Sequence, residues 1–546
     1  MVALEEFPSR HPDLDTRDRY PLYLALLAAF IFFPFLGARD FWAPVEPRYA
    51  EIARVMFIKR EWIIPTVNGG LYTDKPILYF WLVLIVSKIA ISVNEWTVRL
   101  PSALGAVGVV VTTYAIGRDF FSRRVGFIAG AVLATSVRVI WEGRWAHVDM
   151  LFMFFFALSM YFAARAIFNK GSRNELLAAY ALMALATLTK GLIGVVLPAL
   201  ILISFVAVRR DWQLLLEARL PWGILIFLLI AAPWFVLVDQ ATGGKWLKDF
   251  IFIHHIQRYT AGAGHRQPFY YYFTTLPLDF LPWTTFAVPA LFAYRLRRKF
   301  FEEPTQLFFI LWFVAVFLFF TMADTKRELY LLPLFPPMAL FLANYIDDLV
   351  NGALPQGRLY RGLALVCFNL LWIGCLAVPT AAWFVRPDAV AAILPYALAM
   401  ACGSLFIVYF AWQRSPWRVF LSATLTMLLG VQTASIWLLP FLDRFKSSRP
   451  FSLEVKRHVP LTAPLYVYAD TMNDFNFYTQ REIIPVVSSA SELKNLLAQD
   501  RVGYLLIKDR DMDMDRSGGI APERILIREG TAGRSWYLIA LGARRP

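Results

Sequence analysis

Of the 546 residues, 58% are hydrophobic and only 17% are charged, whereas soluble domains carry about 25% charged residues. These values exclude a soluble globular protein, and an aromatic content of 16% excludes a disordered, collagen-like or coiled-coil chain. The net charge of +14 comes from 54 Lys and Arg against 40 Asp and Glu.

Apolar runs follow one another up to about residue 440, and each ends in a short cluster of Arg, Lys, Asp or Pro. Runs of this length cross a hydrocarbon core of about 30 Å as helices. The sequence therefore predicts a polytopic α-helical membrane protein with about 13 transmembrane helices. We expect these helices at 20–38, 100–117, 125–140, 149–168, 176–189, 190–208, 220–239, 277–294, 306–322, 330–347, 361–382, 391–412 and 418–440.

The run 76–93 has the length of a spanning helix but is interrupted by Lys88. Basic clusters occur in every second loop of the predicted topology, which places those loops on the cytoplasmic side. An N-terminus on that side requires 76–93 not to cross, so we expect an interfacial or re-entrant segment. If 76–93 does cross, Met1 lies outside instead.

Residues 441–546 lack long apolar runs and carry 16 Lys and Arg against 13 Asp and Glu. The positive excess therefore lies in the short membrane loops, which argues against a nucleic-acid partner. In the tail, five strand-like runs and one helical run (Ser491–Gln499) predict a small soluble α/β domain. We therefore expect two domains. Residues 1–440 form a transmembrane domain with outer loops at 39–99 and 240–276, and residues 441–546 form the small α/β domain. The three cysteines lie in apolar runs, so no disulfide framework is expected.

The loops on the opposite, outer side of the membrane carry polar residues that the positive-inside rule does not explain. Glu46 and Arg48 begin an amphipathic helical pattern, either as part of a site or as an interfacial anchor. Lys75 lies before 76–93, where its ammonium either snorkels or binds a lipid-linked phosphate. Asp149 and Lys190 lie at the outer ends of predicted membrane helices, where ionisable groups usually serve a function.

Two further outer segments carry cations and aromatic residues. The segment 254–272 contains Arg258, His265 and Tyr271, and its adjacent histidines do not match the spacing of a structural zinc site. Lys326 and Tyr330 precede a Pro-containing helix start. Together these residues favour a site for a phosphate and a sugar.

The order and wording of eight segments resemble the bacterial lipid A 4-amino-4-deoxy-L-arabinose transferases, a family with the GT-C glycosyltransferase fold that is related to protein O-mannosyltransferases. The segments are PVEPRYAEIARVM (44–56), YTDKPILYFW (72–81), HVDMLF (147–152), TLTKG (187–191), HHIQRY (254–259), HRQPFYYY (265–272), LPW (281–283) and KRELYLLPLFP (326–336). One position departs from the family, which commonly has two adjacent acids before x-Arg-Tyr. Here the first is Val45, which argues against a two-carboxylate metal site in this loop.

The resemblance implies an enzyme of the bacterial inner membrane that moves aminoarabinose from undecaprenyl phosphate to a lipid A phosphate on the periplasmic face. This lipopolysaccharide modification gives resistance to cationic peptides and polymyxin. The expected partners are the donor, the lipid A acceptor and membrane lipids, with the chain as a monomer. The reaction requires no cofactor, although a divalent metal is compatible with it, and Glu46, Asp149 and His265 are weak candidates to bind one.

Because the acceptor phosphate is already anionic, the resemblance implies catalysis mainly by positioned cations. Glu46 and Asp149 are the catalytic candidates, which orient the sugar or balance charge. The donor phosphate is assigned to Lys75, Arg258 and Arg48. The other substrate contacts are expected at Lys190, His265, Tyr271, Lys326 and Tyr330.

Two other functions stay open. A protein O-mannosyltransferase shares several of these motifs, but its hydroxyl acceptor needs a carboxylate base. The other alternative is a flippase for a lipid-linked sugar, which is a transporter and not an enzyme. Transporters usually contain internal repeats. No such repeat is found in this sequence.

Overall fold

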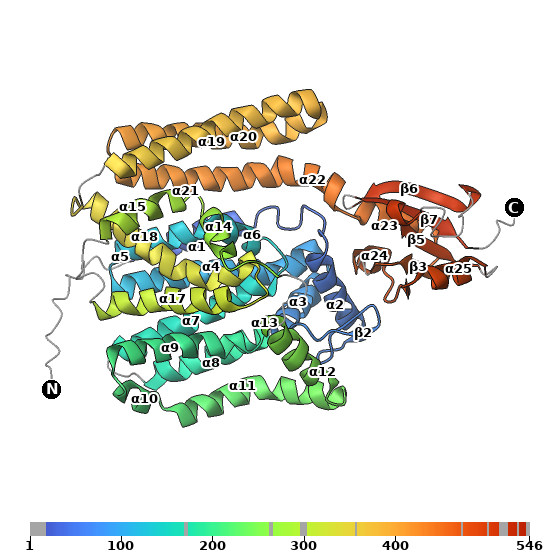
Figure 1. Ribbon diagram of the computed structural model, residues 1–546, viewed down its shortest axis with the longest axis horizontal. Coiled ribbons are helices and arrows are strands. Elements are labelled where there is room, and N and C mark those ends of the chain that lie inside the picture. The colour runs from blue at the N-terminus through green and yellow to red at the C-terminus, as the bar shows by residue number, and fades with distance from the viewer. Residues whose placement is uncertain are drawn as a thin grey trace.

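The computed structural model describes residues 18–168, 173–260, 266–294, 303–354, 358–470, 473–498, 502–512, 522–531 and 534–541. Long helices lie side by side in a bundle, and a small sheet domain formed by the C-terminal residues sits beyond one end of it (Figure 1). Helices α2 and α3 lie at this same end, between the bundle and the sheet domain (Figure 1).

The first half of the bundle contains two small strands and nine helices among the described residues. They are α1 (Tyr20–Phe32), α2 (Val45–Lys59), β1 (Thr66–Val67), β2 (Gly70–Leu71), α3 (Leu78–Ala90), α4 (Glu95–Phe120), α5 (Arg123–Ala134), α6 (Val137–Gly143), α7 (Val148–Phe168), α8 (Arg173–Lys190) and α9 (Ile193–Arg209).

The second half adds two π-helical segments, which often mark functional sites. Its elements are α10 (Gln213–Glu217), α11 (Leu220–Ala241), α12 (Lys245–Lys248), η1 (Asp249–Gln257), α13 (Arg258–Thr260), α14 (Tyr271–Asp279), α15 (Thr284–Tyr294), α17 (Pro304–Met322), η2 (Glu328–Leu334), α18 (Phe335–Val350), α19 (Arg358–Val385), α20 (Pro387–Trp412), α21 (Pro416–Thr433), η3 (Ala434–Leu438) and α22 (Leu439–Lys446).

Eight helices of the described chain are long and apolar enough to cross a membrane, or ten if each of two bent pairs counts as one span. Shorter apolar helices include α1 and α9. Each predicted span coincides with a helix or a bent pair of helices, so the polytopic α-helical class is confirmed. The count of 13 stays a prediction.

Helix α3 occupies most of the ambiguous run and is 13 residues long. At about 1.5 Å per residue it is roughly 20 Å long, short of a core of about 30 Å. Ile91 ends it in a left-handed conformation. Asn94 then starts α4, because its side chain accepts hydrogen bonds from Trp96 N and Thr97 N in a capping box. These features favour a segment that turns back without crossing.

Helix α2 begins at Val45, close to the predicted start, but its surroundings differ from those of an interfacial anchor. Nine of its 15 residues are buried, including both carboxylates, Glu46 and Glu51. The helix packs against α3 on one side and against α24 (Asn473–Thr479) of the C-terminal domain on another. The sequence predicted the apolar stripe of α2, but it did not indicate that the C-terminal domain packs against this helix.

The C-terminal domain has a mixed five-stranded sheet in the order β4-β3-β5-β7-β6. Strands β3, β4 and β5 are parallel, and β7 runs antiparallel to β5 and β6. Apolar residues alternate to both faces of β5, because both faces are covered. The elements are α23 (Arg449–His458), β3 (Leu465–Tyr468), α24, β4 (Val486–Val487), α25 (Ala490–Ala498), β5 (Tyr504–Lys508), η4 (Asp509–Asp511), η5 (Pro522–Arg524), β6 (Ile525–Thr531) and β7 (Arg534–Ala540).

Candidate active site

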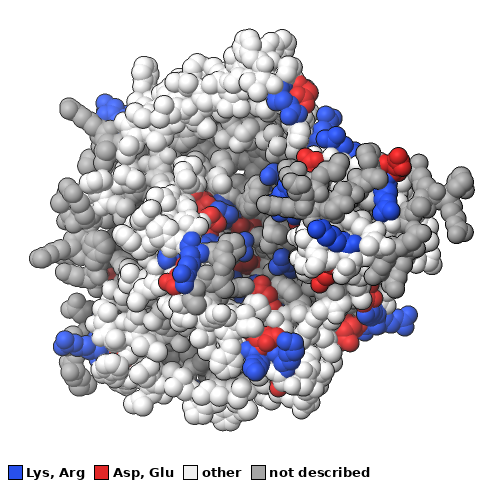
Figure 2. Space-filling view, turned by 45° about the vertical axis from the view of Figure 1, so that its right-hand side comes forward, with Lys and Arg blue, Asp and Glu red and all other residues white. Residues whose placement is uncertain are grey.

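A cavity of about 380 Å³ opens at the end of the bundle that faces the C-terminal domain. Acidic and basic side chains gather in a hollow on this face (Figure 2). Cations lie at one end of the cavity and apolar or aromatic side chains form the rest of its wall. The lining residues are Asp74, Lys75, Lys190, Leu192, Ile193, Val196, His254, His255, Ile256, Tyr259, Thr260, Phe319, Phe320, Ala323, Thr325 and Tyr330.

Lys75 reaches the cavity from the loop between the β1–β2 hairpin and α3. Its Nζ donates to Asp74 Oδ1 at 3.1 Å, and its side chain is only 16% exposed. The loop is held in place because Trp246 Nε1 donates to Tyr72 O at 2.9 Å. An ammonium group is therefore fixed at the cavity wall with a carboxylate as its neighbour.

Lys190 is the last residue of α8, and its Nζ forms a buried ion pair with Asp149 at the start of α7. The same Nζ lies 5.1 Å from the ring centroids of Phe152 and Tyr330, within cation–π distance. The chain turns at Gly191, whose φ is +95° and whose added Cβ would lie 2.6 Å from His255 Nε2. Only glycine fits there, so this residue sets the direction in which the helix ends.

The histidines of η1 also line the cavity, next to the two lysines. His254 Nε2 lies 3.0 Å from Thr73 Oγ1, and its Nδ1 lies 3.4 Å from Asp74 Oδ1. His255 Nδ1 lies 2.8 Å from Phe250 O. Arg258 begins α13 directly after η1, next to the cavity residue Tyr259. The side chain of Arg258 and the whole of His265 are outside the described part of the chain.

Three predicted substrate residues lie apart from the cavity lining. Lys326 is buried and donates to Gln267 O at 3.2 Å and Ala323 O at 2.5 Å, so its ammonium ties two loops together. Tyr271 donates to Glu328 on η2. Arg48 is half-buried on α2. Lys75, Lys190 and Tyr330 thus share one cavity, Asp149 adjoins it, and the other three do not line it.

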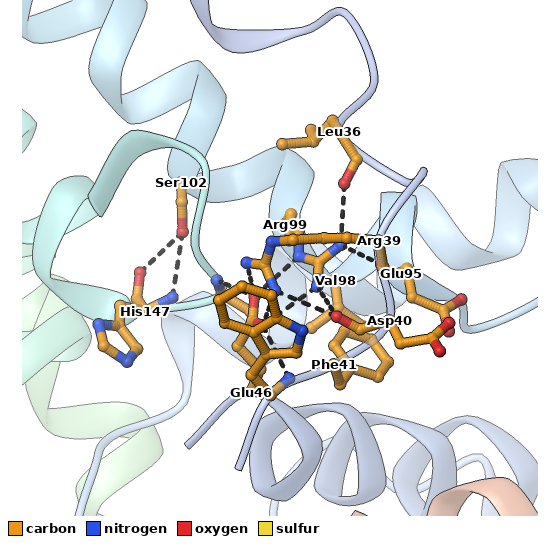
Figure 3. Close-up of polar contacts among 12 residues, drawn as sticks. Leu36, Arg39, Asp40, Phe41, Glu46, Glu95, Val98, Arg99, Ser102 and His147 are labelled. Carbon is orange, nitrogen blue, oxygen red and sulfur yellow. Dashed lines mark hydrogen bonds and ion pairs between the residues drawn. The ribbon is translucent and has the colours of Figure 1, made fainter. Parts of the chain in front are cut away.

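Glu46 is fully buried in a cluster with Arg39 and Arg99 (Figure 3). Its Oε1 accepts from Arg39 Nη2 at 2.9 Å and Arg99 Nε at 2.7 Å, and its Oε2 accepts from Arg39 Nη1 at 2.6 Å and Arg99 Nη2 at 3.0 Å. The backbone N–H groups of Trp42 and Ala146 donate to the same carboxylate at 3.2 and 3.0 Å. Six donors therefore surround the two oxygens.

Burial raises the pKa of Glu46, but the charges of Arg39 and Arg99 outweigh burial and hold this pKa at about 2. Burial, followed by the charge of Arg99, lowers the pKa of Arg39 to about 10. All three groups are therefore ionised at neutral pH. Of the two predicted roles of Glu46, orienting the sugar or balancing the charge of cations, these contacts favour charge balance, because its oxygens hold the loop 39–46 against Ala146 and Arg99.

Of the three weak metal candidates, Glu46 and Asp149 lie in the described residues and His265 lies outside them. Glu46 is surrounded by N–H donors, and Asp149 faces the ammonium of Lys190. Within the described ranges, no three His, Cys, Asp or Glu side chains come together in a group that could hold a metal ion.

The sequence patterns pointed to neither Arg39 nor Arg99, and they gave no role to the buried pair of Glu142 and His147. Arg99 lies 53 positions from Glu46, so no local spacing links them. A signal was nevertheless present, since an arginine between Val98 and Leu100 at the start of an apolar run needs a buried partner. Asp74 and His254 lay in the recognised segments without an assigned role.

Comparisons with known proteins identify the family. The undecaprenyl phosphate-alpha-4-amino-4-deoxy-L-arabinose arabinosyl transferase of Aeromonas salmonicida (strain A449) is 30% identical over 438 residues, covering 78% of this chain and 77% of the relative. The enzyme of that name from Shewanella sediminis (strain HAW-EB3) is 26% identical over 484 residues, covering 85% of each chain. The chain belongs to this arabinosyl transferase family. A model of the dolichyl-phosphate-mannose-protein mannosyltransferases also matches residues 74–237.

The fold comparison agrees with this family. The crystal structure of ArnT from Cupriavidus metallidurans, bound to undecaprenyl phosphate, superposes with a TM-score of 0.77 at 20% identity, covering 96% of this chain and 99% of ArnT. An archaeal oligosaccharyltransferase, AglB from Archaeoglobus fulgidus, gives a TM-score of 0.50 at 12% identity and covers 91% and 69%. The GT-C fold is thereby confirmed. This arabinosyl transferase homologue is a multi-pass membrane glycosyltransferase that uses a polyprenyl-phosphate-linked sugar donor.

Proposed function

We propose that the chain transfers 4-amino-4-deoxy-L-arabinose from undecaprenyl phosphate to a phosphate group of lipid A. The observation that carries this proposal is the cavity in which Lys75 and Lys190 lie beside an apolar and aromatic wall. Ammonium groups suit a phosphate, and the apolar wall suits the first part of a prenyl chain. The names of the relatives supply the sugar and the donor lipid.

In the reaction the bond between the anomeric carbon and the donor phosphate oxygen breaks, and a bond to an oxygen of the acceptor phosphate forms. Undecaprenyl phosphate leaves with the electron pair. Lys75 and Lys190 stabilise the charge that develops on its oxygens, and Arg258 is proposed as a third cation from α13. Lys326 and Arg48 are placed outside this set, because neither lines the cavity.

The carboxylates near the cavity serve charge balance in this proposal. Asp149 is held by Lys190, and Asp74 lies between Lys75 and His254. A donor phosphate that displaces either carboxylate from its lysine leaves that carboxylate available for the amine of the sugar. His265, Tyr271 and Tyr330 remain proposed substrate contacts, of which Tyr330 lines the cavity.

We further propose the bacterial inner membrane as the location, with the site on the periplasmic face and the chain acting as a monomer. Helix α10, which lies between Arg210 and Arg219, is at the end of the bundle opposite the C-terminal domain (Figure 1), and positive loops stay in the cytoplasm. The cavity and residues 441–546 then share the outer side. The same proposal includes thirteen membrane spans, a domain boundary near residue 440 and a helix α3 that does not cross the membrane.

The mannosyltransferase model matched to residues 74–237 makes a hydroxyl acceptor the second candidate. That reaction needs a carboxylate that accepts a proton, whereas a phosphate acceptor is already anionic and needs cations, which Lys75 and Lys190 supply at the cavity wall. The geometry therefore favours the phosphate acceptor.

The test is transfer by the purified chain, in nanodiscs, from undecaprenyl phosphate-aminoarabinose to lipid A, followed by mass spectrometry of the lipid. We expect an addition of one aminoarabinose, and no addition when both lipid A phosphates have been removed. Transfer to lipid A without phosphates, or to a peptide hydroxyl, would favour the mannosyltransferase-like reaction instead.

A further inference from the structure

A second cavity of about 310 Å³ lies on the far side of the Glu46 cluster, among α6, α20, α21 and η3. Its polar lining includes Arg39, Arg144 and Ser435, and most of its other lining residues are apolar or aromatic. The lining residues are Phe35, Leu36, Arg39, Val137, Ile140, Trp141, Arg144, Trp145, Tyr396, Met400, Met427, Gly430, Val431, Ala434, Ser435, Leu438, Leu439 and Leu442. Only Arg39 belongs also to the cluster around Glu46, so this cavity is separate from the donor cavity.

Arg144 is a buried cation in the wall of this second cavity, with a side chain only 9% exposed. Its guanidinium donates to Ile31 O at 2.6 Å, Pro34 O at 2.9 Å and Ser435 Oγ at 2.9 Å. No carboxylate pairs with it among the residues the structure describes. Because a guanidinium has five N–H donors, and these bonds use three, both charge and donors remain for an anion.

Arg39 supplies a second guanidinium to the same wall. Its Cζ lies 3.9 Å from the ring centroid of Trp145 and 5.0 Å from that of Trp42. Trp141 stacks on Trp145 at 4.6 Å.

Arg39 and Arg99 share the carboxylate of Glu46, and Asp443 and Glu95 also lie within electrostatic reach of Arg39 and Arg99, respectively. The charges that act on Arg144 among the described residues are those of Arg39 and Arg99. The uncompensated positive charge of this wall is therefore that of Arg144.

The apolar part of the cavity opens toward the side of the bundle. Val137 and Trp141, at its edge, are 41% and 42% exposed. Both are on α6, which forms with α5 one of the two bent helix pairs that are long and apolar enough to count as a span. Tryptophan is enriched at the membrane–water boundary. A ligand entering here would come from the bilayer rather than from water.

We propose that this cavity binds one anionic membrane phospholipid, with its phosphate on Arg144 and Arg39 and an acyl chain along α20, α21 and η3. Arginine pairs with phosphate through two parallel hydrogen bonds, and basic pockets between membrane helices take anionic lipid head groups. The buried position of both arginines and the volume of about 310 Å³ favour one small phospholipid over a multi-chain glycolipid.

The bound phospholipid has a structural consequence for the active site. Arg39 binds Glu46, and Glu46 accepts from Ala146 N, three residues before Asp149. A phosphate on Arg39 and Arg144 therefore braces the loop that leads to the donor cavity. This proposal does not rest on aminoarabinose transfer, and its test involves no turnover.

The test is native mass spectrometry of the intact chain in detergent, titrated with phosphatidylglycerol, phosphatidylcholine of the same chains, or inorganic phosphate. We expect phosphatidylglycerol to bind at least about tenfold more tightly than phosphatidylcholine, because the choline cation of the latter is repelled by the two arginines that bind the phosphate. Arg144→Gln should lower that affinity about tenfold or more. Ala434→Phe should lower it similarly by filling the apolar part, without changing an arginine.

The control is Arg386→Gln, which changes an exposed arginine at the α19–α20 turn whose partner is Asp388. This variant should bind phosphatidylglycerol as the wild type does. Equal binding of the two phospholipids, or displacement of the lipid by inorganic phosphate, would overturn the proposal. Unchanged affinity in Ala434→Phe would also overturn it, even if Arg144→Gln fails to fold.

Discussion

The ammonium group of Lys75 lies on the cavity wall beside Asp74 and is mostly shielded from water. Removing it should take away one cation from the leaving phosphate. We expect Lys75→Ala to lower kcat by about 10²–10³-fold, like the loss of one oxyanion-hole donor, and Lys75→Arg to recover part of it. The measurement is transfer between purified donor and acceptor lipids. Lys59→Ala, at an exposed pair with Glu482, is the control, and a Lys75→Ala variant with near-normal kcat would remove Lys75 from the site.

Lys190 and Asp149 are each about 6% exposed and form one buried ion pair. Breaking such a pair by removing one partner costs about 3–5 kcal/mol, because a charge is left buried. We therefore expect Lys190→Met and Asp149→Asn each to lower the unfolding temperature in detergent. The double variant should recover most of the loss yet stay inactive. Recovered activity in the double variant would show that the pair only supports the fold.

Glu46 has a pKa of about 2 in the folded chain, below its ordinary value of 4.5. A lowered pKa adds stability that is present above about pH 4.5 and is lost as the pH falls toward 2. We expect Glu46→Gln to cost about 3–5 kcal/mol at neutral pH. The difference in unfolding temperature from the wild type should be largest above about pH 5 and shrink toward pH 3.

The matched control for this pH series is Glu482→Gln, in an exposed pair with Lys59. Exposed pairs contribute about 1 kcal/mol or less, so this variant should follow the wild type at every pH. A Glu46→Gln difference that grows as the pH falls would contradict the assigned ion pairs.

Among the elements, α3 has the most consequence for topology, because whether it crosses decides the side on which the N-terminus lies. Ile91, at its end, is 84% exposed, and Arg60 ends the preceding α2. We expect cysteines placed at positions 60 and 91, in a chain with Cys367, Cys375 and Cys402 replaced, to react with an impermeant maleimide from the same, outer side. Labelling of position 91 from the cytoplasmic side alone would show that α3 spans. A cysteine at the basic position Arg210 serves as the cytoplasmic control.

At the scale of the whole molecule, hydrogen bonds join the C-terminal domain to the first outer loop. Asn68 Nδ2 donates to Ile484 O at 3.1 Å, while Asn68 Oδ1 accepts from Ile484 N at 2.7 Å and Asn476 Nδ2 at 3.0 Å. Tyr478 Oη accepts from Phe41 N at 2.9 Å. The C-terminal domain therefore helps to position the loop that holds Glu46.

Asn68 has a φ of +50°, a conformation that asparagine and glycine tolerate. Asn68→Gly keeps this backbone freedom but removes the three bonds. We expect it to cost about 1–3 kcal/mol from unpaired groups and to speed limited proteolysis between residues 446 and 465. Asn68→Ala should cost more, because it adds backbone strain. Equal proteolysis rates in wild type and Asn68→Gly would show that the domain is held by other contacts.

The sequence by itself determined the membrane class, the helix positions, the alternating basic loops and the small α/β tail. Each of these depends on local composition, run length or periodicity, which survive without any long-range contact. The sequence also indicated Lys75, Lys190 and Tyr330 as candidate site residues, because charged and aromatic residues beside apolar runs often serve a function. The family resemblance joined them into one site.

Only the tertiary structure decided what these groups face. Glu46 and Arg99 are far apart along the chain and meet through the packing of α2 against α4, so Glu46 became a buried support for the loops. Glu142, two positions before Arg144, pairs with Arg138 and His147 instead, and Arg144 forms no ion pair among the described residues. Only the packing of η3 shows that its charge lines a cavity. Ion pairing and burial depend on distances between elements, which no local pattern encodes.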